Sequence, residues 1–243
     1  MDYDFIVVGA GSAGCVLANR LTADGMHKVL LLEAGDKDAS PLIHMPNGVG
    51  VVIAGTKYNW KFNTASEPGL NNRELFWPRG KALGGSSSIN GMIYIRGHAA
   101  DYDSWRQQGN VGWGYEDVLP YFKKSMNQER GEDDYHGVGG PLNVKDGNSK
   151  MPIHRKFIDA GIEAGYPFNP DFNGAEQEGV GPMQLTKIGN KRCSAARGYL
   201  APIMGRKNLT IETDARLTRI VLEDGRATGV EYLDKGEVKK ANS

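Results

Sequence analysis

Two short apolar runs near the start of the chain set the first expectation about its fold. FIVV at residues 5–8 and VLLL at 29–32 contain apolar residues without interruption, which predicts strands buried on both faces. The stretch between them, 12–25, has helical periodicity and ends at Gly25. It places Val16, Leu17, Arg20 and Leu21 at spacings of three and four. The pattern predicts a βαβ unit with parallel, neighbouring strands and a right-handed crossover.

Three later stretches also have apolar residues three and four positions apart, and they predict helices over 101–109, 115–129 and 151–165. The expected inner faces are Leu119, Phe122 and Met126 in the second helix, and Phe157, Ile158 and Ile162 in the third.

Strand patterns follow in two places. Residues 139–144 predict a strand, and 208–233 predict a β meander with a hairpin turn at Asp224-Gly225. Residues 36–75 contain Pro, Asn, Gly and aromatic residues, which favours a long ordered excursion over a linker.

Charge and cysteine content narrow the function classes. Lys plus Arg equals Asp plus Glu at 29 each, so the net charge is zero, and we expect no nucleic-acid partner. Cys15 and Cys193 give no disulfide framework, which favours a reducing compartment. No signal peptide or membrane-spanning run is evident. We expect a cytoplasmic protein; a peripheral contact with the inner membrane stays open.

A glycine-rich turn follows the first predicted strand. Gly9, Gly11 and Gly14 form G-x-G-x-x-G between a strand and a helix, where the glycines allow a tight turn, close approach of a pyrophosphate and close helix packing. Glu33 follows the second strand, where it could accept hydrogen bonds from ribose hydroxyls. The motif predicts a dinucleotide site, with NADP disfavoured and both NAD and FAD open. Cys15 is expected to be a packing residue.

A second glycine cluster lies in FWPRGKALGGSSSINGMIYIRG, at residues 76–97. It is no Walker loop, because Ala82 follows Lys81 where Ser or Thr is required, and it contains no G-x-S-x-G nucleophile elbow. A rigid, glycine-lined wall followed by an apolar strand suits the close approach of a flat ligand. FAD is a dinucleotide long enough to use two such walls.

The stretch from Arg79 to Asp103 is similar to the first signature of the glucose–methanol–choline (GMC) oxidoreductases, a family of FAD enzymes. Further segments, among them YNW, DDYHGVGGPLNV, DFNGAEQEGVGPMQ and SAARGYL, resemble the same family, so the resemblance covers nearly the whole chain. Within the family, the chain is similar to the bacterial choline dehydrogenases and the FAD-dependent alcohol dehydrogenases.

The resemblance implies a set of cofactor-binding residues. The pyrophosphate turn would be Gly9, Gly11, Ser12 and Gly14, with Glu33 at the ribose and Leu217 at the adenine. The flavin-side wall would be Gly84, Gly85, Ser86, Asn90, Gly91, Met92 and Ile93. Some relatives attach FAD through a histidine just before the asparagine; Ile89 stands there in this chain, which implies noncovalent FAD.

The implied fold class is α/β: a Rossmann-like FAD-binding βαβ unit with a β meander, plus part of a substrate domain. We expect residues 1–145 to be the first part of the FAD-binding domain, 146–198 to contribute to the substrate domain, and 199–243 to return to the FAD-binding domain. The family's catalytic pair, a histidine base followed by a second histidine or an asparagine, lies in a C-terminal half that we expect this chain to lack. We therefore assign no catalytic residue and no metal site.

The implied function is that of an FAD-dependent oxidoreductase acting on the CH–OH group of a primary alcohol. Hydride would go to flavin N5, and electrons to an acceptor other than NAD, such as a quinone. Two alternatives stay open: an inactive FAD-binding fragment of such an enzyme, and an FAD-containing hydroxynitrile lyase of the same family. Which alcohol is oxidised, whether a quinone or oxygen accepts the electrons, and the oligomeric state also stay open.

Overall fold

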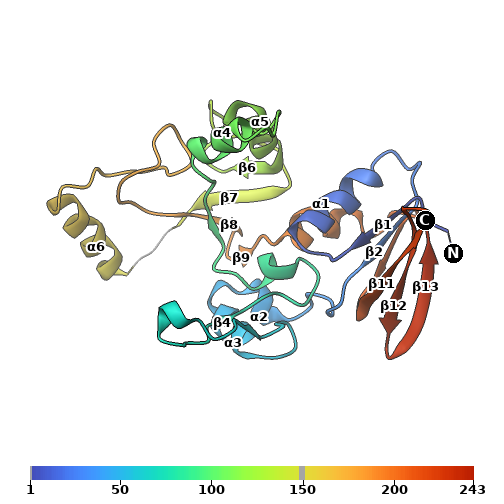
Figure 1. The fold of residues 1–243 in the computed structure, drawn as a ribbon. Helices are drawn as coiled ribbons and strands as arrows, with labels where there is room; N and C mark the ends of the chain where they lie inside the picture. The colour runs from blue at the N-terminus through green and yellow to red at the C-terminus, as the bar shows by residue number, and fades with distance from the viewer. Residues whose placement is uncertain (1, 148–150) are drawn as a thin grey trace. The chain divides into compact units, whose positions relative to one another are not determined.

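The computed structural model describes residues 2–147 and 151–243, in which the chain forms two compact units (Figure 1). Unit 1 comprises Met1–Gly91 and Asn190–Ser243, and unit 2 comprises Met92–Gly189. The boundaries expected at 145/146 and 198/199 concern cofactor and substrate roles, and they stay a prediction. Within the described residues, no helix is both long and apolar enough to cross a membrane.

A parallel sheet is the centre of unit 1. Its strands are β1 (Phe5–Val8), β2 (Val29–Leu32) and β10 (Leu209–Glu212), in the order β1-β2-β10. The predicted βαβ unit is confirmed, because β1 and β2 are parallel neighbours joined by α1 (Ser12–Leu21) (Figure 1).

Two expectations about these strands are wrong. β1 lies at the sheet edge, so Phe5 and Val8 are 38% and 48% exposed, whereas β2 is buried along its whole length. β10 was expected inside the meander, but it pairs in parallel with β2. Strand pairing over such a long sequence separation leaves no local signal in the pattern.

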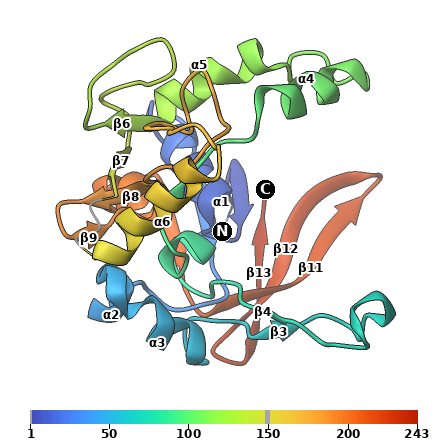
Figure 2. The same ribbon diagram turned by 90° about the vertical axis from the view of Figure 1, so that its left-hand side faces the viewer.

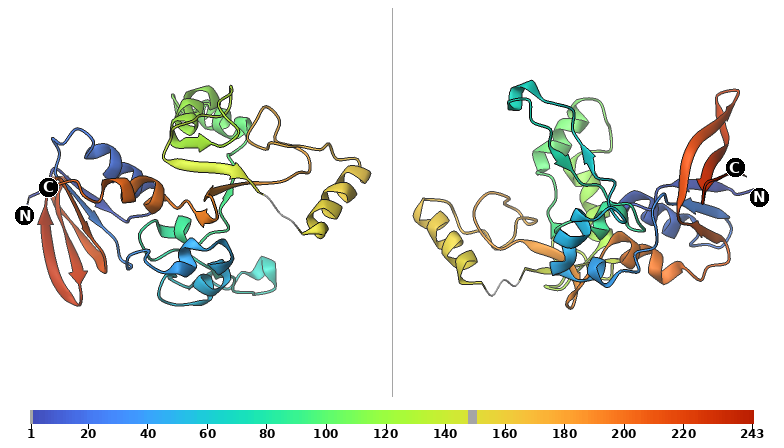
Figure 3. Two further views of the ribbon diagram at one scale, coloured as in Figure 1. Left: turned by 180° about the vertical axis from the view of Figure 1, so that it is seen from behind. Right: turned by 90° about the horizontal axis from the view of Figure 1, so that it is seen from below.

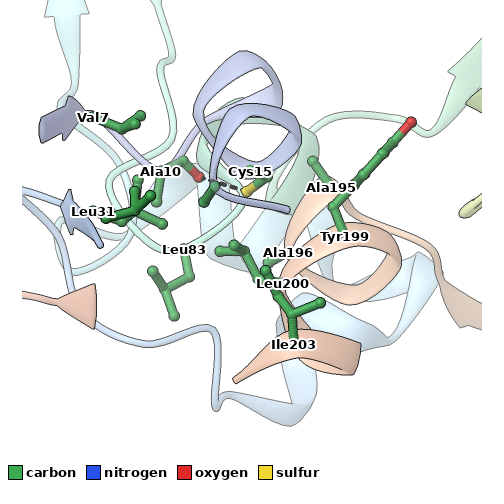
Figure 4. Packing of buried hydrophobic residues seen from close by; sticks show 12 residues of the cluster. Val7, Ala10, Cys15, Leu31, Leu83, Ala195, Ala196, Tyr199, Leu200 and Ile203 are labelled. Carbon is green, nitrogen blue, oxygen red and sulfur yellow. Dashed lines mark hydrogen bonds between the residues drawn. The ribbon is translucent and has the colours of Figure 1, made fainter. Parts of the chain in front are cut away.

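The inner face of α1 is made mainly of small residues, and Val16 and Leu21 pack against the same core cluster. Its buried residues are Gly14, Cys15, Ala18 and Asn19, whereas Leu17 is 48% exposed. Small side chains allow close approach of the π-helical turn Ala196–Leu200, and the Asn19 amide donates to the Tyr199 carbonyl over 2.8 Å. Figure 4 shows Cys15 and Ala196 in this packed layer. The helix ends at Leu21, four residues before Gly25.

The meander forms a second sheet of unit 1, made of β11 (Ala215–Glu223), β12 (Arg226–Asp234) and β13 (Glu237–Asn242) (Figure 2). The predicted turn is confirmed: Asp224 and Gly225 have φ of 48° and 80°, as a two-residue type I′ hairpin requires. Both sheets contribute to one core cluster, consisting of Tyr3, Leu30, Leu32, Ala215, Val230, Tyr232 and Ala241.

Between β2 and the second glycine cluster, unit 1 contains short elements. They are α2 (Pro41–His44), α3 (Val49–Ala54), β3 (Phe62–Asn63) and β4 (Phe76–Trp77). Ile43 and Val52 from this region form a buried cluster with Ile89. Three-residue and four-residue 3₁₀ turns span Pro46–Gly48, Pro68–Leu70, Gly85–Ser88 and Ala201–Ile203, and β9 is Lys191–Arg192.

The described part of unit 2 contains a small sheet and three helices. The strands β5 (Ile93–Tyr94), β8 (Gln184–Ile188), β7 (Leu142–Asp146) and β6 (Met126–Gln128) are adjacent in that order. The helices are α4 (Ala99–Gln107), α5 (Tyr115–Ser125) and α6 (Pro152–Glu163). The predicted helices and the predicted strand at 139–144 are therefore present.

Two predictions about these helices were wrong. α5 ends at Ser125, and the buried Met126 lies in β6, paired with Leu142. On α6, Phe157 and Ile162 are 72% and 41% exposed instead of turned inward, and the helix stands clear of α4 and α5 (Figure 3, yellow). Helical periodicity predicts that one face is apolar, but it does not identify what covers that face.

Candidate functional site

The two glycine clusters meet in unit 1. The Gly84 N–H donates to the Ala10 carbonyl over 2.7 Å, and a Cβ added at Gly85 would lie 2.8 Å from Gly11 Cα. Gly85 also has a φ of +54°, which favours glycine. The second cluster therefore lies directly against the first turn, and together they form one backbone surface.

The first turn has the geometry that its motif predicts. Gly9 has a φ of +90°, and a Cβ at Gly14 would lie only 1.9 Å from the Gly9 carbonyl oxygen. A Cβ at Gly11 would meet no atom within 4 Å. Gly9 thus allows the tight turn and Gly14 the close helix packing, while Gly11 leaves its backbone accessible in front of the helix N-terminus.

Glu33 braces this turn. Its side chain is buried, and its two carboxylate oxygens accept from the Ala10 and Gly35 N–H groups, each over 2.9 Å. Burial raises the pKa of the Glu33 carboxyl, against the lowering effect of these two hydrogen bonds and of Lys81. The carboxylate thus ties the end of β2 to the glycine turn; its contact with a ribose stays a prediction.

The three consecutive serines of the second cluster bind backbone groups around it. Ser86 Oγ accepts from the Gly80 N–H over 3.0 Å, and Ser88 Oγ donates to the Leu83 carbonyl over 2.7 Å. Ser87 Oγ donates to Gly84 O and accepts from the Ala195 N–H over 2.9 Å. Each hydroxyl therefore holds the glycine-rich backbone in place, which explains why a serine run follows the glycines.

A cavity of about 480 Å³ opens in front of this backbone surface. Six of the predicted residues line it: Gly9, Gly11, Glu33, Gly85, Ser86 and Leu217. The other predicted residues of unit 1 do not line it, namely Ser12, Gly14, Gly84, Asn90 and Gly91. Ser12 is the exposed first residue of α1, and Gly14 and Gly84 act through packing.

Met92 and Ile93 belong to unit 2. Met92 has a φ of +64°, unusual for a residue with a side chain, and its carbonyl accepts from the Thr186 N–H over 2.8 Å. Ile93 is 55% exposed and pairs with Leu185 in the sheet. Their predicted role at the flavin stays a prediction.

The cavity also has an aromatic and cationic part, none of whose residues is among the predicted cofactor-binding residues. Trp60 and Phe62 line it with their rings stacked, 5.8 Å apart and 6° from parallel, and the Lys81 ammonium lies 4.9 Å from the centre of the Trp60 ring. Arg79 and Arg216 line the same cavity. Aromatic faces bind planar groups, and arginines bind phosphate oxygens. In the sequence, only Trp60, which follows Asn59, indicated this aromatic part of the cavity.

Arg192 was also missed. Its guanidinium is buried, and Nη1 donates to Asn90 Oδ1 over 2.8 Å and to the Ser87 carbonyl over 3.1 Å. Arg192 lies more than 100 residues from the cluster that it contacts, in a short polar stretch with no pattern of its own. No sequence signal could have identified it.

Cys15 has the predicted packing role. Its thiol donates to the Ala10 carbonyl over 3.2 Å, as the dashed line in Figure 4 marks. Burial raises the pKa of the Cys15 thiol to about 12, so the reactive thiolate is not formed at neutral pH. Among the described residues, no group of three His, Cys, Asp or Glu side chains could hold a metal ion.

Comparisons with known proteins agree with this geometry. A family model described as GMC oxidoreductase matches residues 3–243. An alcohol dehydrogenase [acceptor] of Pseudomonas putida is 51% identical over 99% of the chain, and a mitochondrial choline dehydrogenase of Mus musculus is 48% identical over 99%. The chain spans 44% and 41% of the length of these two proteins.

A solved structure is similar over the whole chain. It is an FAD-dependent oxidoreductase from Chaetomium thermophilum, with a TM-score of 0.90 and 28% identity, covering 100% of this chain and 44% of that one.

Proposed function

Because the chain belongs to the GMC oxidoreductase family, we propose that it binds FAD in the cavity of unit 1 and serves the oxidation of a primary alcohol. The observation that carries this proposal is the direct contact between the two glycine clusters, Gly85 against Gly11. It creates a glycine-lined backbone surface beside a helix N-terminus, which suits the close approach of a dinucleotide.

The residues of the cavity fit FAD in chemistry and in space. A Cβ at Gly11 would extend into open space, as expected where backbone must approach a phosphate. Arg79 and Arg216 supply positive charge for the pyrophosphate, and the N-terminus of α1 adds its dipole. Glu33 would accept from the ribose, and Leu217 would contact the adenine. The structural relative from Chaetomium thermophilum supports this choice of cofactor.

When bound, FAD supplies the hydride acceptor, N5, and passes the electrons to an acceptor other than NAD. The described residues bind and orient it. The serine hydroxyls fix the Gly84–Ser88 backbone, so the wall needs no reorganisation on binding. A base for the alcohol proton is not assigned to any residue of this chain.

We propose a noncovalent attachment, because Ile89 offers no nucleophile. Its side chain is 2% exposed and packs with Ile43 and Val52. Acid precipitation of the FAD-loaded protein should release the flavin into the supernatant. Flavin retained in the pellet would contradict the noncovalent part of the proposal and leave the cofactor part intact.

The substrate class is proposed from the relatives: a primary alcohol first, and choline as the alternative. The electron acceptor is proposed to be a quinone or a similar carrier, and the location to be cytoplasmic.

The test is an FAD titration followed by anaerobic addition of substrate. Purified protein should quench FAD fluorescence with saturation at one equivalent. Bleaching of the bound flavin by a short primary alcohol would then show that these residues also support the oxidation of the alcohol. No binding with excess FAD would refute the proposed cofactor site. Binding without bleaching by alcohols or choline would refute alcohol oxidation by these 243 residues and retain the cofactor site.

A further inference from the structure

A second cavity lies within unit 2 and shares no residue with the cofactor cavity of unit 1. Its volume is about 210 Å³. The titratable residues of its wall are Arg96, His98, Tyr115 and Tyr135, and none of the described Asp and Glu residues lines it. A wall with a cation and hydroxyl groups but no carboxylate favours a negatively charged ligand.

Arg96 is the permanently charged group of this wall, and it is only 7% exposed. Nη1 donates to the Tyr135 carbonyl over 2.8 Å, and Nη2 donates to Met126 Sδ over 3.0 Å. The guanidinium also lies 5.1 Å from the centre of the Phe122 ring. These partners are all uncharged, and Nε is buried with no hydrogen-bond partner among the described residues.

The charge of Arg96 has no counter-ion in the part of the chain that the structure describes. None of the ion pairs found there includes it. Asp133 and Asp171 instead pair with His136, and Asp101 accepts from the His98 N–H at the start of α4. Because an unpaired buried cation is costly to folding, we expect a negative group from outside the described chain to complete it.

The charge of Arg96 acts on the cavity wall at Tyr115. Burial raises the pKa of the Tyr115 hydroxyl, and the positive charge of Arg96 offsets only part of this rise. The hydroxyl therefore stays protonated at neutral pH, which makes it a hydrogen-bond donor beside a cation. The exposed Glu116 is the one carboxylate whose charge also acts on this hydroxyl among the described residues.

His98 adds a second donor to the wall. Its Nδ1 accepts from the Ala100 N–H over 3.1 Å, so the neutral ring carries its proton on Nε2. Gly97, His98 and Ala99 line the cavity and lead into the first turn of α4, whose N-terminus has the positive end of the helix dipole. The dipole makes a smaller contribution than Arg96, in the same direction.

We propose that this cavity binds a small oxyanion, of the size of acetate, phosphate or sulfate, with Arg96 as its counter-ion and Tyr115 and His98 as its donors. One water takes up roughly 30 Å³ in the liquid, so the cavity holds a compact ion together with a few waters. The bound ion would connect α4, α5 and the segment 172–177, which all contribute to the wall.

The experiment is isothermal titration calorimetry of the purified protein with sodium phosphate, sodium sulfate and sodium acetate, at constant ionic strength. At least one of these anions should bind saturably at one equivalent. Binding of acetate alone would identify a carboxylate as the ligand, and binding of phosphate or sulfate alone would identify a tetrahedral anion. No saturable binding of any of the three would overturn the proposal.

Tyr115→Phe tests the wall directly. Loss of a donor to a charged ligand should weaken binding about tenfold. Tyr121→Phe is the matched control, because Tyr121 lies on the same helix, is 71% exposed and does not line the cavity. It should leave the affinity unchanged, and equal affinities of the two variants would overturn the role of Tyr115 in the site.

Two charge variants test the sign of the ligand. Arg96→Met should abolish binding, and wild-type affinity in the folded variant would overturn the proposal. Glu116→Gln decides the matter if Arg96→Met does not fold: it removes an exposed negative charge near Tyr115 and should strengthen anion binding about twofold. Weaker binding by Glu116→Gln would contradict a negatively charged ligand.

These titrations use no FAD. A failure of anion binding would therefore leave the proposed function intact, and a failure of FAD binding would leave the anion site intact.

Discussion

The candidate site of unit 1 and the charged cluster around His136 in unit 2 are held together by different interactions. In unit 1, glycine backbones touch directly, and the hydrogen-bond partners of the buried cation Arg192 among the described residues are neutral. In unit 2, the buried His136 lies between two carboxylates: Nδ1 is 2.8 Å from Asp133 Oδ1, and Nε2 is 3.3 Å from Asp171 Oδ2. Arg130 adds a second cation beside Asp171, at 3.6 Å.

The difference predicts different sensitivities. The backbone contacts of the wall depend on no titrating group other than the bracing Glu33, so pH should affect the wall less than it affects the His136 cluster, whereas an added methyl group should disrupt it. A cluster of paired charges should tolerate changes of volume better but depend on pH. The glycine wall leaves its polar backbone groups accessible to a ligand. The charged groups around His136 pair with one another. We expect the first to bind a cofactor and the second to stabilise the fold.

The largest effect is expected from Gly14→Ala. The new Cβ would lie 1.9 Å from the Gly9 carbonyl oxygen, a backbone atom that cannot move without opening the turn. We expect a loss of about 3 kcal/mol or more in the free energy of unfolding, measured by urea denaturation. Gly50→Ala is the matched control: it lies in α3 with nothing within 4 Å, and it should stabilise by about 0.5 kcal/mol. Equal effects of the two substitutions would contradict the close-packed wall.

Gly11→Ala should separate folding from binding. Its Cβ meets no protein atom within 4 Å and its φ of −76° suits alanine, so thermal stability should be close to that of the wild type. The methyl group would project where a pyrophosphate must approach, and FAD affinity should fall about 100-fold, or ~2.7 kcal/mol. Fluorescence quenching measures this loss. Unimpaired FAD binding by the variant would place the cofactor elsewhere.

The His136 cluster should give unit 2 a pH-dependent stability. Burial alone would lower the pKa of His136, but its contacts with Asp171 and Asp133 outweigh burial and raise it above 6.5. Burial alone would raise the pKa values of Asp133 and Asp171. Hydrogen bonds from His136 and nearby N–H groups outweigh burial, so both pKa values lie below 3.8. The histidine's contribution is therefore complete below pH 6.5 and is lost as pH rises through its raised pKa. The contribution of the two carboxylates is present above pH 3.8 and is lost as pH falls through their lowered pKa values.

His136→Gln tests this expectation. At pH 5.5 the variant should be less stable than the wild type by about 2 kcal/mol, and the difference should shrink towards pH 9. Melting temperatures across this range measure it. A difference that is independent of pH would mean that His136 acts by packing alone.

The smallest effect is expected from Phe157→Ser on α6. The phenylalanine side chain is 72% exposed, so its removal should change the free energy of unfolding by no more than about 0.5 kcal/mol. A loss of several times this value in thermal denaturation would show that the apolar face of α6 is covered in solution.

Much of the site could be predicted from residue types at fixed spacing. Gly9, Gly11 and Gly14 required a turn between a strand and a helix, and Asp224-Gly225 required a type I′ hairpin. These are local constraints, because a positive φ or a missing side chain acts within a few residues of its own position. The FAD-related roles of Ser12, Glu33, Asn90 and Leu217 stay predictions that the titrations above can test.

The sequence by itself therefore determined the βαβ unit, its glycine turn and the hairpins, because their signals are short-range. The tertiary structure alone decided the inner face of α1, the pairing of β10 with β2, the Trp60–Phe62 stack and the place of Arg192 beneath Asn90. Periodicity records which positions are apolar, but close approach depends on the size of the residues that face each other. In α1, small residues face Ala196 and exclude the larger Leu17, which no pattern within the helix could reveal.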